Sequence, residues 1–333
     1  AEAFRDGTRI YLERHANGVT KLDDFIAALE EASGLDLGHW VTGWLETAGL
    51  NTVTAEPKCT DGMLRDLNLV QSAPADYPAL RDHRVQVALL TWNDDDSAQA
   101  TVLPVTLSGE VTQVPDAAGQ PCPQLIYPNY GDWGFIKVAL DTRTLTGIGR
   151  NLRRVEDPML RSMLWDSLWE MVRDARLDLE GYAEIVFEAL PGEANEKVAS
   201  QVAENIGATM RYLWKLPDEM EPVLADLGPR FEELAWRQAV DAPNGSDLQT
   251  LWLDTYRRLA HTDAALGRLE RQLTGDAQLP VEALDQDRRW LVLGRLNSFD
   301  RPGALELAQA EQENDPSDAG AQMSVSYTHL TLP

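Results

Sequence analysis

The chain has 333 residues, of which 44% are hydrophobic and 25% are charged. These values are ordinary for a globular protein, and the length leaves room for two or three domains. The formal net charge of −25 argues against nucleic acids and anionic membrane surfaces as partners, because their phosphate groups repel an acidic protein. No run of about 18 apolar residues is present, so the sequence predicts no membrane-spanning helix.

The first residues, AEAFRDGTRIYLERH, have the apolar spacing of an amphipathic helix. They include neither an initiator Met nor the basic and apolar segments of a signal peptide. We therefore expect the sequence to begin inside a larger protein.

Residues 1–50 are predicted to be helical, because apolar side chains recur at three- and four-residue spacing. Thr20 is the expected N-cap of a second helix and Gly34 its expected C-cap. Asp36 is expected to open a third helix.

Two tryptophans, Trp40 and Trp44, stand one turn apart on that third helix, which is expected to end at Gly49. They form either an aromatic binding site or a packing face at a joint between domains. Their four-residue spacing places both on one helix face, directly before the first expected strand, and this favours the joint.

Residues 51–142 change from helical spacing to a period of two, which is typical of half-buried strands. About seven short strands, bounded by Pro, Gly, Asn and Asp turns, predict a small β-sandwich. The clearest alternating segments are MLRDLNLVQS, HRVQVALLTW, ATVLPVTL, EVTQVP, QLIYP and WGFIKVAL.

Cys59 and Cys122 are too few to staple a chain of this length. This cysteine usage suits a reducing compartment, so the expected location is cytoplasmic. A single bridge between the two stays open as an alternative if their strands lie side by side.

Residues 143–323 return to helical spacing, with about eight helices joined by short polar turns. Helices in such a series pack antiparallel, which predicts an α-solenoid of HEAT-like helical repeats with a concave, ligand-binding face. Trp165 and Trp169 flank an apolar row and are expected in its core. The expected helix starts are Asp157 followed by Pro158, Asn195, and positions near Pro217, Ser246, Thr262, Asp285 and Pro302.

The last nine residues, VSYTHLTLP, fit none of these predicted elements. They resemble the translation of a transposase sequencing adapter across nine consecutive codons. We therefore expect residues 324–333 to be an artefact with no part in the function.

The sequence predicts no catalytic, cofactor-binding or metal-binding residue in this chain. None of the five histidines has another histidine three to five residues away, so no helix face offers a pair of metal ligands. The segment GIGRNL at 147–152 lacks the third glycine of a dinucleotide fingerprint and is expected to be a turn before a helix. The acidic runs 94–96 and 30–31 lack the spaced oxygen ligands of a calcium site and are interpreted as solvated. The histidines are His15, His39, His83, His261 and His329.

Three segments, 4–15, 20–37 and 40–51, resemble the C-terminal end of the catalytic domain in the aminopeptidase N family, a group of zinc metallopeptidases. The segment NYGDWGFIKVALD at 129–141 resembles the last strand of that family's sandwich domain. The remaining helices resemble the C-terminal helical domain shared with the endoplasmic-reticulum aminopeptidases. The similarity runs in order through residues 1–323 and is closest to the bacterial branch.

The resemblance implies a multidomain α+β chain. Residues 1–50 would be the C-terminal helices of a truncated, thermolysin-like catalytic domain. Residues 51–142 would be the β-sandwich, residues 143–323 the helical solenoid, and residues 324–333 the adapter artefact.

The resemblance also implies a function for the parent protein. Members of the family remove N-terminal residues from peptides with a zinc ion held by His-Glu-x-x-His and a downstream Glu. Those motifs would lie upstream of Ala1, so no zinc ligand is carried over. The chain would then be a non-catalytic part, inactive alone, whose helical domain encloses the active-site chamber. Its partners would be the peptide substrates and the missing N-terminal and catalytic domains.

Two alternatives stay open. One is a stand-alone, non-catalytic helical-repeat interaction protein. The other is a degenerate member of the family that has lost its zinc motif. The sequence upstream would distinguish them, because only the truncated enzyme has an intact zinc motif there.

Overall fold

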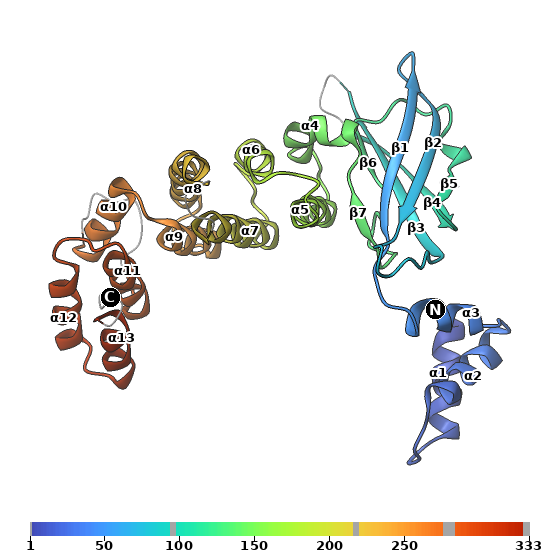
Figure 1. The fold of residues 1–333 in the computed structure, drawn as a ribbon, viewed down its shortest axis with the longest axis horizontal. Coiled ribbons are helices and arrows are strands. Elements are labelled where there is room, and N and C mark those ends of the chain that lie inside the picture. Colours follow the sequence, from blue (N-terminus) through green and yellow to red (C-terminus); the bar gives the residue numbers. More distant parts are fainter. Residues whose placement is uncertain (1, 94–97, 216–219, 276–283, 329–333) are drawn as a thin grey trace. The chain divides into compact units, whose positions relative to one another are not determined.

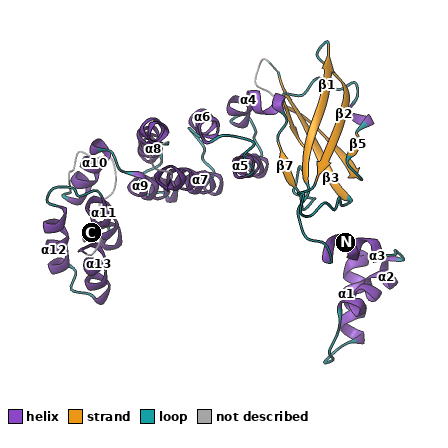
Figure 2. Ribbon diagram, viewed as in Figure 1, coloured by secondary structure: helices purple, strands orange, loops and turns teal. Residues whose placement is uncertain are grey.

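The computed structural model describes residues 2–93, 98–215, 220–275 and 284–328. The chain divides into two compact units, Ala1–Leu89 with Ala100–Asp141, and Leu90–Gln99 with Thr142–Pro333. Strands occur in the middle of the sequence, with helices before and after them (Figures 1 and 2). The expected α+β class is therefore confirmed. Among the described residues, no helix combines the length and the apolar character that crossing a bilayer requires.

Three helices open the first unit, as expected for residues 1–50: α1 (Glu2–Arg14), α2 (Leu22–Ser33) and α3 (Gly38–Leu45). Helices α1 and α2 pack closely at Gly7, where an added Cβ would lie 2.9 Å from the Leu29 Cα. Phe4 and Tyr11 of α1 contact the ring of Phe25 on α2 with centroid distances of 6.4 and 5.1 Å.

The helix ends in this region agree with the sequence in part. Gly34 has a φ of 69° and caps α2 as expected, with its N–H donating to the Glu30 carbonyl at 2.8 Å. The prediction that Thr20 is the N-cap of α2 is wrong, because Lys21 occupies that position. The Thr20 hydroxyl hydrogen-bonds to the Tyr11 hydroxyl at 2.6 Å instead. Asp36 accepts a hydrogen bond from the Gly38 N–H at 2.9 Å, and α3 ends before Gly49, at Leu45.

Two sheets follow, with strand orders β5-β2-β1-β7 and β4-β3-β6. Strands β1 and β2 form an antiparallel hairpin closed by Asp61 and Gly62, both with positive φ, which is the backbone that a two-residue hairpin turn requires. Alternate residues of both sheets meet in one hydrophobic core that includes Val53, Leu67 and Val87, and this confirms the expected sandwich. The strands are β1 (Thr52–Thr60), β2 (Met63–Ser72), β3 (His83–Trp92), β4 (Ala98–Leu107), β5 (Val111–Gln113), β6 (Leu125–Tyr127) and β7 (Lys137–Ala139).

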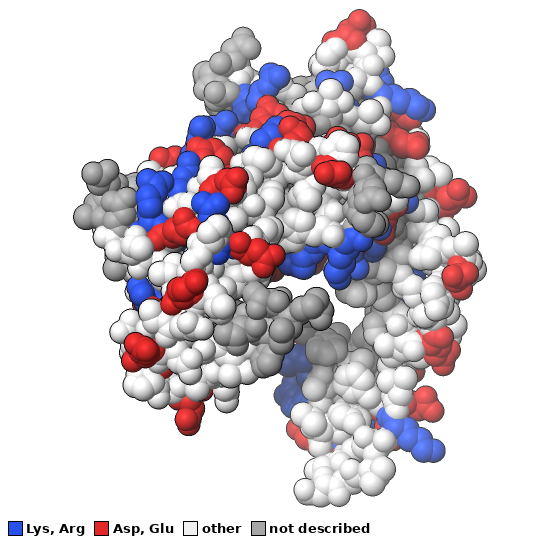
Figure 3. All heavy atoms as spheres, turned by 60° about the vertical axis from the view of Figure 1, so that its left-hand side comes forward, with Lys and Arg blue, Asp and Glu red and all other residues white. Residues whose placement is uncertain are grey.

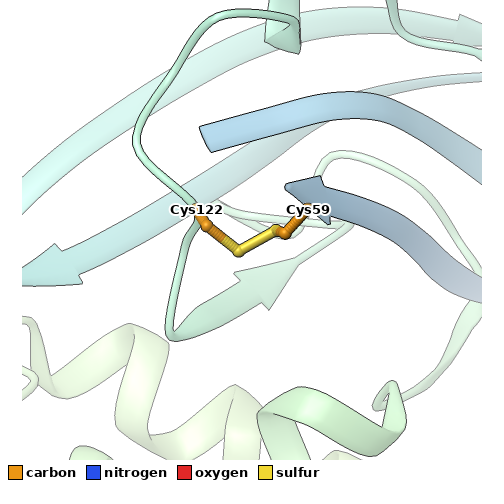
Figure 4. Close-up of a disulfide and its surroundings, with 2 residues drawn as sticks. All are labelled: Cys59 and Cys122. Atoms are coloured by element: carbon orange, nitrogen blue, oxygen red, sulfur yellow. A yellow bond between two sulfur atoms is a disulfide. The ribbon is translucent and has the colours of Figure 1, made fainter. Parts of the chain in front are cut away.

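A disulfide joins Cys59, near the end of β1, to Cys122 in the segment before β6 (Figure 4). The Cys122 N–H also donates to the Gly62 carbonyl at 2.8 Å, so this segment is held against the hairpin turn twice. The single bridge left open by the sequence is therefore present. The two cysteines do not support a reducing compartment, because disulfides persist mainly in oxidising ones.

The second unit is built mostly of helices arranged in two rows. In one row α5 packs on α7, α7 on α9 and α9 on α11; in the other α4 packs on α6 and α6 on α8. Trp165 is fully buried between these helices, as expected. The helices are α4 (Thr142–Leu152), α5 (Pro158–Arg173), α6 (Leu179–Ala189), α7 (Glu196–Lys215), α8 (Glu221–Asp241), α9 (Asp247–Leu259), α10 (Asp263–Leu273), α11 (Gln286–Ser298), α12 (Ala304–Asn314) and α13 (Asp318–Thr328).

Most of the expected helix starts in this unit are confirmed by side-chain caps. Asp157, Ser246, Thr262 and Asp285 each accept a hydrogen bond from a backbone N–H two or three residues ahead. The Asn195 side chain does the same at the start of α7. The start expected near Pro217 lies outside the described residues, as do the acidic run 94–96 and His329.

The sequence predicted a turn before a helix at segment 147–152. This prediction is wrong, because the segment is the last part of α4. An added Cβ at Gly149 would lie 2.0 Å from the Glu188 carboxylate on α6. The absence of a side chain at Gly149 therefore allows α4 and α6 to pack closely. At the other end of the unit, α13 extends to Thr328 and includes the first residues of the expected adapter segment, whose origin stays a prediction.

The side chains of Trp92 and Arg154 meet within this second unit. The Arg154 guanidinium lies 5.0 Å from the centre of the Trp92 ring, and one of its nitrogens is 3.5 Å from the Asn93 carbonyl. The end of β3 is thereby attached to the loop after α4.

Candidate functional site

The histidines are spread over the described residues and form no joint site. His15 contacts the Tyr11 ring, His39 is exposed, and His83 and His261 lie in different units. Within the described ranges, no three His, Cys, Asp or Glu side chains come together as metal ligands. The described residues therefore do not fit the zinc ion that the family resemblance implies.

Arg81 joins the end of α3 to the sandwich. Its guanidinium donates to three backbone carbonyls, those of Gly43 at 2.5 Å, Thr47 at 2.8 Å and Ala48 at 3.0 Å. The last carbonyls of a helix lack partners within the helix and carry partial negative charge, so a cation is favourable there. Arg81 is only 6% exposed, which keeps water from competing for these bonds.

Trp44 completes this joint. The Arg81 guanidinium lies 5.5 Å from the centre of its ring, and the His83 ring meets it edge-on at 5.1 Å. His83 Nε2 is 3.3 Å from the side-chain oxygen Oδ1 of Asn51, which also accepts from the backbone N–H of Arg81 at 3.2 Å. Burial, with a smaller contribution from the Arg81 charge, lowers the pKa of His83 to about 4, so the ring is neutral at physiological pH.

Trp40 does not belong to the same cluster, although the helical spacing placed both tryptophans on one face. Its side chain is 45% exposed and lines a separate groove on α1–α3 of about 250 Å³. This apolar groove is also lined by Ala3, Phe4, Phe25, Leu29, Ser33, Leu35 and Leu37. Exposed apolar patches of this kind mark places where another surface packs.

A second groove, of about 450 Å³, lies between α7 and α9 in the second unit. We call it the α7–α9 groove. Arg211 and Trp214 of α7 and Arg258 of α9 line it, together with Glu204 and Gly207 of α7. Among the described residues, neither arginine has a carboxylate within ion-pair distance, and Arg258 donates to the Thr255 hydroxyl at 3.3 Å. The groove therefore combines two guanidinium donors, one carboxylate and an aromatic wall.

Several other arginines of the second unit are paired with carboxylates. Examples are Arg288 with Asp254 at 2.9 Å and Arg230 with Glu184 at 2.6 Å. Figure 3 shows the same mixing of basic and acidic side chains on the visible face. Periodicity could not reveal this groove, because its walls are about 50 residues apart in the sequence.

Comparison with known proteins places the fold. Residues 125–326 match the ERAP1-like C-terminal domain family. The chain is 32% identical over 330 residues to the aminopeptidase N of Streptomyces lividans, an alignment that covers 96% of this chain and 38% of that protein. The aminopeptidase N of Caulobacter vibrioides is 46% identical over 56 residues, covering 17% of this chain and 6% of that protein.

Among solved structures, the crystal structure of Legionella pneumophila aminopeptidase A in complex with aspartic acid is similar in fold. It has a TM-score of 0.53 and 14% sequence identity, and the match covers 98% of this chain and 41% of that one. The chain thus spans about two fifths of the length of the relatives that it matches along its whole length. It belongs to the ERAP1-like C-terminal domain family and is related to the aminopeptidase N proteins.

Proposed function

We propose that this chain is the non-catalytic C-terminal part of a zinc-dependent aminopeptidase that removes N-terminal residues from peptides. The observation that carries the proposal is the unequal coverage: 96% of this chain but only 38% of the Streptomyces lividans aminopeptidase N is aligned. The zinc ion and its ligands would belong to the part of the parent protein that this chain does not include.

The apolar groove on α1–α3 supports the proposal that residues 1–50 belong to the catalytic domain of the parent enzyme. Phe4 and Leu35 in its wall are each 62% exposed, and covering such side chains is favourable. In the parent enzyme, residues 1–50 would be the end of the thermolysin-like catalytic domain, and the rest of that domain would cover this groove. The contacts of Arg81 and Trp44 would then fix the orientation of the catalytic domain relative to the sandwich, residues 51–142.

The α7–α9 groove supports the proposal that the helical domain encloses the chamber in which peptides are cleaved. Residues 143–323 would form the α-solenoid that encloses the catalytic chamber, with this groove open to the peptide. Arg211 and Arg258 can donate to peptide carbonyl or carboxylate oxygens, and Trp214 offers an apolar face. Enclosure would exclude folded proteins and admit peptides.

The cellular location follows less directly. The cytoplasmic location expected from the sequence stays a prediction, and the Cys59–Cys122 disulfide favours an oxidising compartment instead.

The proposal is tested by joining this chain to the upstream part of the Streptomyces lividans aminopeptidase N in place of the region that it matches. The fusion is expected to bind zinc and to release the arylamine from an aminoacyl-arylamide, whereas this chain alone does neither. Zinc-dependent turnover by the chain alone would overturn the proposal, as would an inert fusion that folds. A fusion that lacks residues 143–323 is expected to lose its discrimination between short peptides and a folded protein with an accessible N-terminus.

A further inference from the structure

The buried carboxylate of Glu232, on α8, organises the turn between α9 and α10. It accepts hydrogen bonds from the N–H groups of His261 at 2.6 Å and Thr262 at 2.9 Å, and from the Thr262 hydroxyl at 2.6 Å. Glu232 is only 4% exposed, so these donors replace the water that its charge requires. Thr262 is also the N-cap of α10, so the carboxylate binds the residue at which that helix begins.

The His261 ring is held by the same carboxylate. Its Nδ1 lies 2.9 Å from Glu232 Oε1 and 3.0 Å from the Leu259 carbonyl oxygen. Both neighbours are acceptors, so Nδ1 carries a hydrogen in either protonation state and Nε2 is the atom that gains or loses a proton. An added Cβ at Gly228 of α8 would lie 2.6 Å from Nε2, so this glycine is what allows the ring to approach.

The other side of the ring reaches the α7–α9 groove. The Trp214 ring, which lines that groove, lies edge-on to His261 with a centroid distance of 6.0 Å. Arg295 of α11 lies 4.9 Å from the same tryptophan ring and donates to the Ala260 carbonyl at 2.5 Å. Phe299, also of α11, is 6.5 Å from His261. Four elements therefore meet at one imidazole.

The charged groups that face His261 are Glu232 from α8 and Arg295 from α11, while α7 contributes the uncharged Trp214. Burial lowers the pKa of His261, but the hydrogen bond and charge of Glu232 outweigh it, and the pKa is raised above its ordinary value of 6.5. A raised pKa means that the folded state binds the proton more tightly than the unfolded state. The stabilisation is complete below pH 6.5 and is lost as pH rises through the raised pKa.

We propose that His261 and Glu232 form a proton-operated clamp that sets the position of Trp214 in the wall of the α7–α9 groove. In the protonated state the imidazolium is attracted to the Glu232 carboxylate, and this holds the His261 ring in T-shaped contact with Trp214. Loss of the proton from Nε2 leaves the Nδ1–H hydrogen bond to Glu232 in place, but it removes the charge attraction between the two groups and leaves Arg295 as the cation against the tryptophan ring. The groove thus responds to pH through a residue that does not line it. The effect on peptide binding rests on the proposed function, but the clamp itself does not.

The clamp is tested on the full chain by nuclear magnetic resonance. Imidazole resonances report the midpoint of His261, and the indole N–H resonance of Trp214, assigned from Trp214→Phe, reports the groove wall. We expect the Trp214 resonance to shift with the His261 midpoint, above the ordinary histidine value. Glu232→Gln should lower that midpoint, and His261→Gln should abolish the shift of Trp214. Glu233→Gln, next to Glu232 on α8 but paired with Arg237 and Arg268, is the matched control and should change neither.

A Trp214 resonance that stays constant while His261 titrates would overturn the proposal. The same conclusion would follow if Glu232→Gln left the midpoint unchanged. The titration of the unmodified chain requires no variant to fold, so it decides the matter even if a substitution is not tolerated. Loss of peptide binding with an intact clamp would count against the proposed function alone.

Discussion

Reduction of the Cys59–Cys122 disulfide should destabilise the sandwich strongly and leave the helical rows unaffected. The two cysteines are separated by 63 residues, so the bridge closes a long loop in the unfolded chain. The entropy that such a loop loses corresponds to about 4 kcal/mol of stability. Because β1 and β2 lie at the centre of the four-stranded sheet, their backbone amides should register most of this loss.

Hydrogen exchange measured by mass spectrometry can follow the two units separately. Peptides from β1 and β2 should lose protection when a reducing agent is added, while peptides from α5 and α7 keep theirs. The double variant Cys59→Ser/Cys122→Ser is the control, because it should resemble the reduced protein with or without the reducing agent. Equal protection of β1 and β2 in oxidised and reduced protein would refute the reasoning.

Three further changes probe the first unit. Arg81→Gln removes three hydrogen bonds from a charged donor to backbone carbonyls, and it should lower the stability of α3 by about 1.5–3 kcal/mol. This loss should be measured as faster hydrogen exchange of the α3 amides. Unchanged exchange would show that the end of the helix needs no cation. Gly7→Ala places a methyl carbon 2.9 Å from the Leu29 Cα and should lower the free energy of unfolding by about 1–3 kcal/mol in a denaturant titration, whereas Gly43→Ala meets nothing within 4 Å and serves as the control. His83 has a pKa lowered to about 4, so as pH falls from 6.5 the unfolded chain protonates this histidine before the folded chain does, and the sandwich should lose stability progressively down to pH 4. His83→Gln should flatten this component of the dependence of stability on pH. An unaltered slope would contradict the lowered pKa of His83.

The features that the sequence predicted best are those decided within a few residues. Helix caps such as Asp157, Ser246 and Thr262 bind backbone N–H groups two or three positions away, so residue type and spacing suffice to find them. The alternation of the strands is equally local, and it correctly indicated two sheets with one core. The wrong N-cap at Thr20 arose because its hydroxyl found a partner on another helix, Tyr11.

The features that sequence reasoning missed depend on distant residues. Trp40 and Trp44 share a helix face, but only Trp44 meets Arg81, which comes from a loop 37 residues later in the chain. Glycines in segment 147–152 suggested a turn, whereas Gly149 leaves room for a side chain from α6. The α7–α9 groove and the clamp beside it combine four elements whose local patterns are ordinary. Nothing in a short window of sequence could have indicated them.

The contact between Trp92 and Arg154 has a practical consequence for anyone who exchanges modules between relatives. The second unit includes residues 90–99 as well as residues from 142 onward, so the chain passes between the two units three times. A helical module cut at residue 142 would therefore lack the aromatic ring that lies 5.0 Å from the Arg154 guanidinium. Recombination should carry residues 90–99 together with the helices, with three crossover points instead of one.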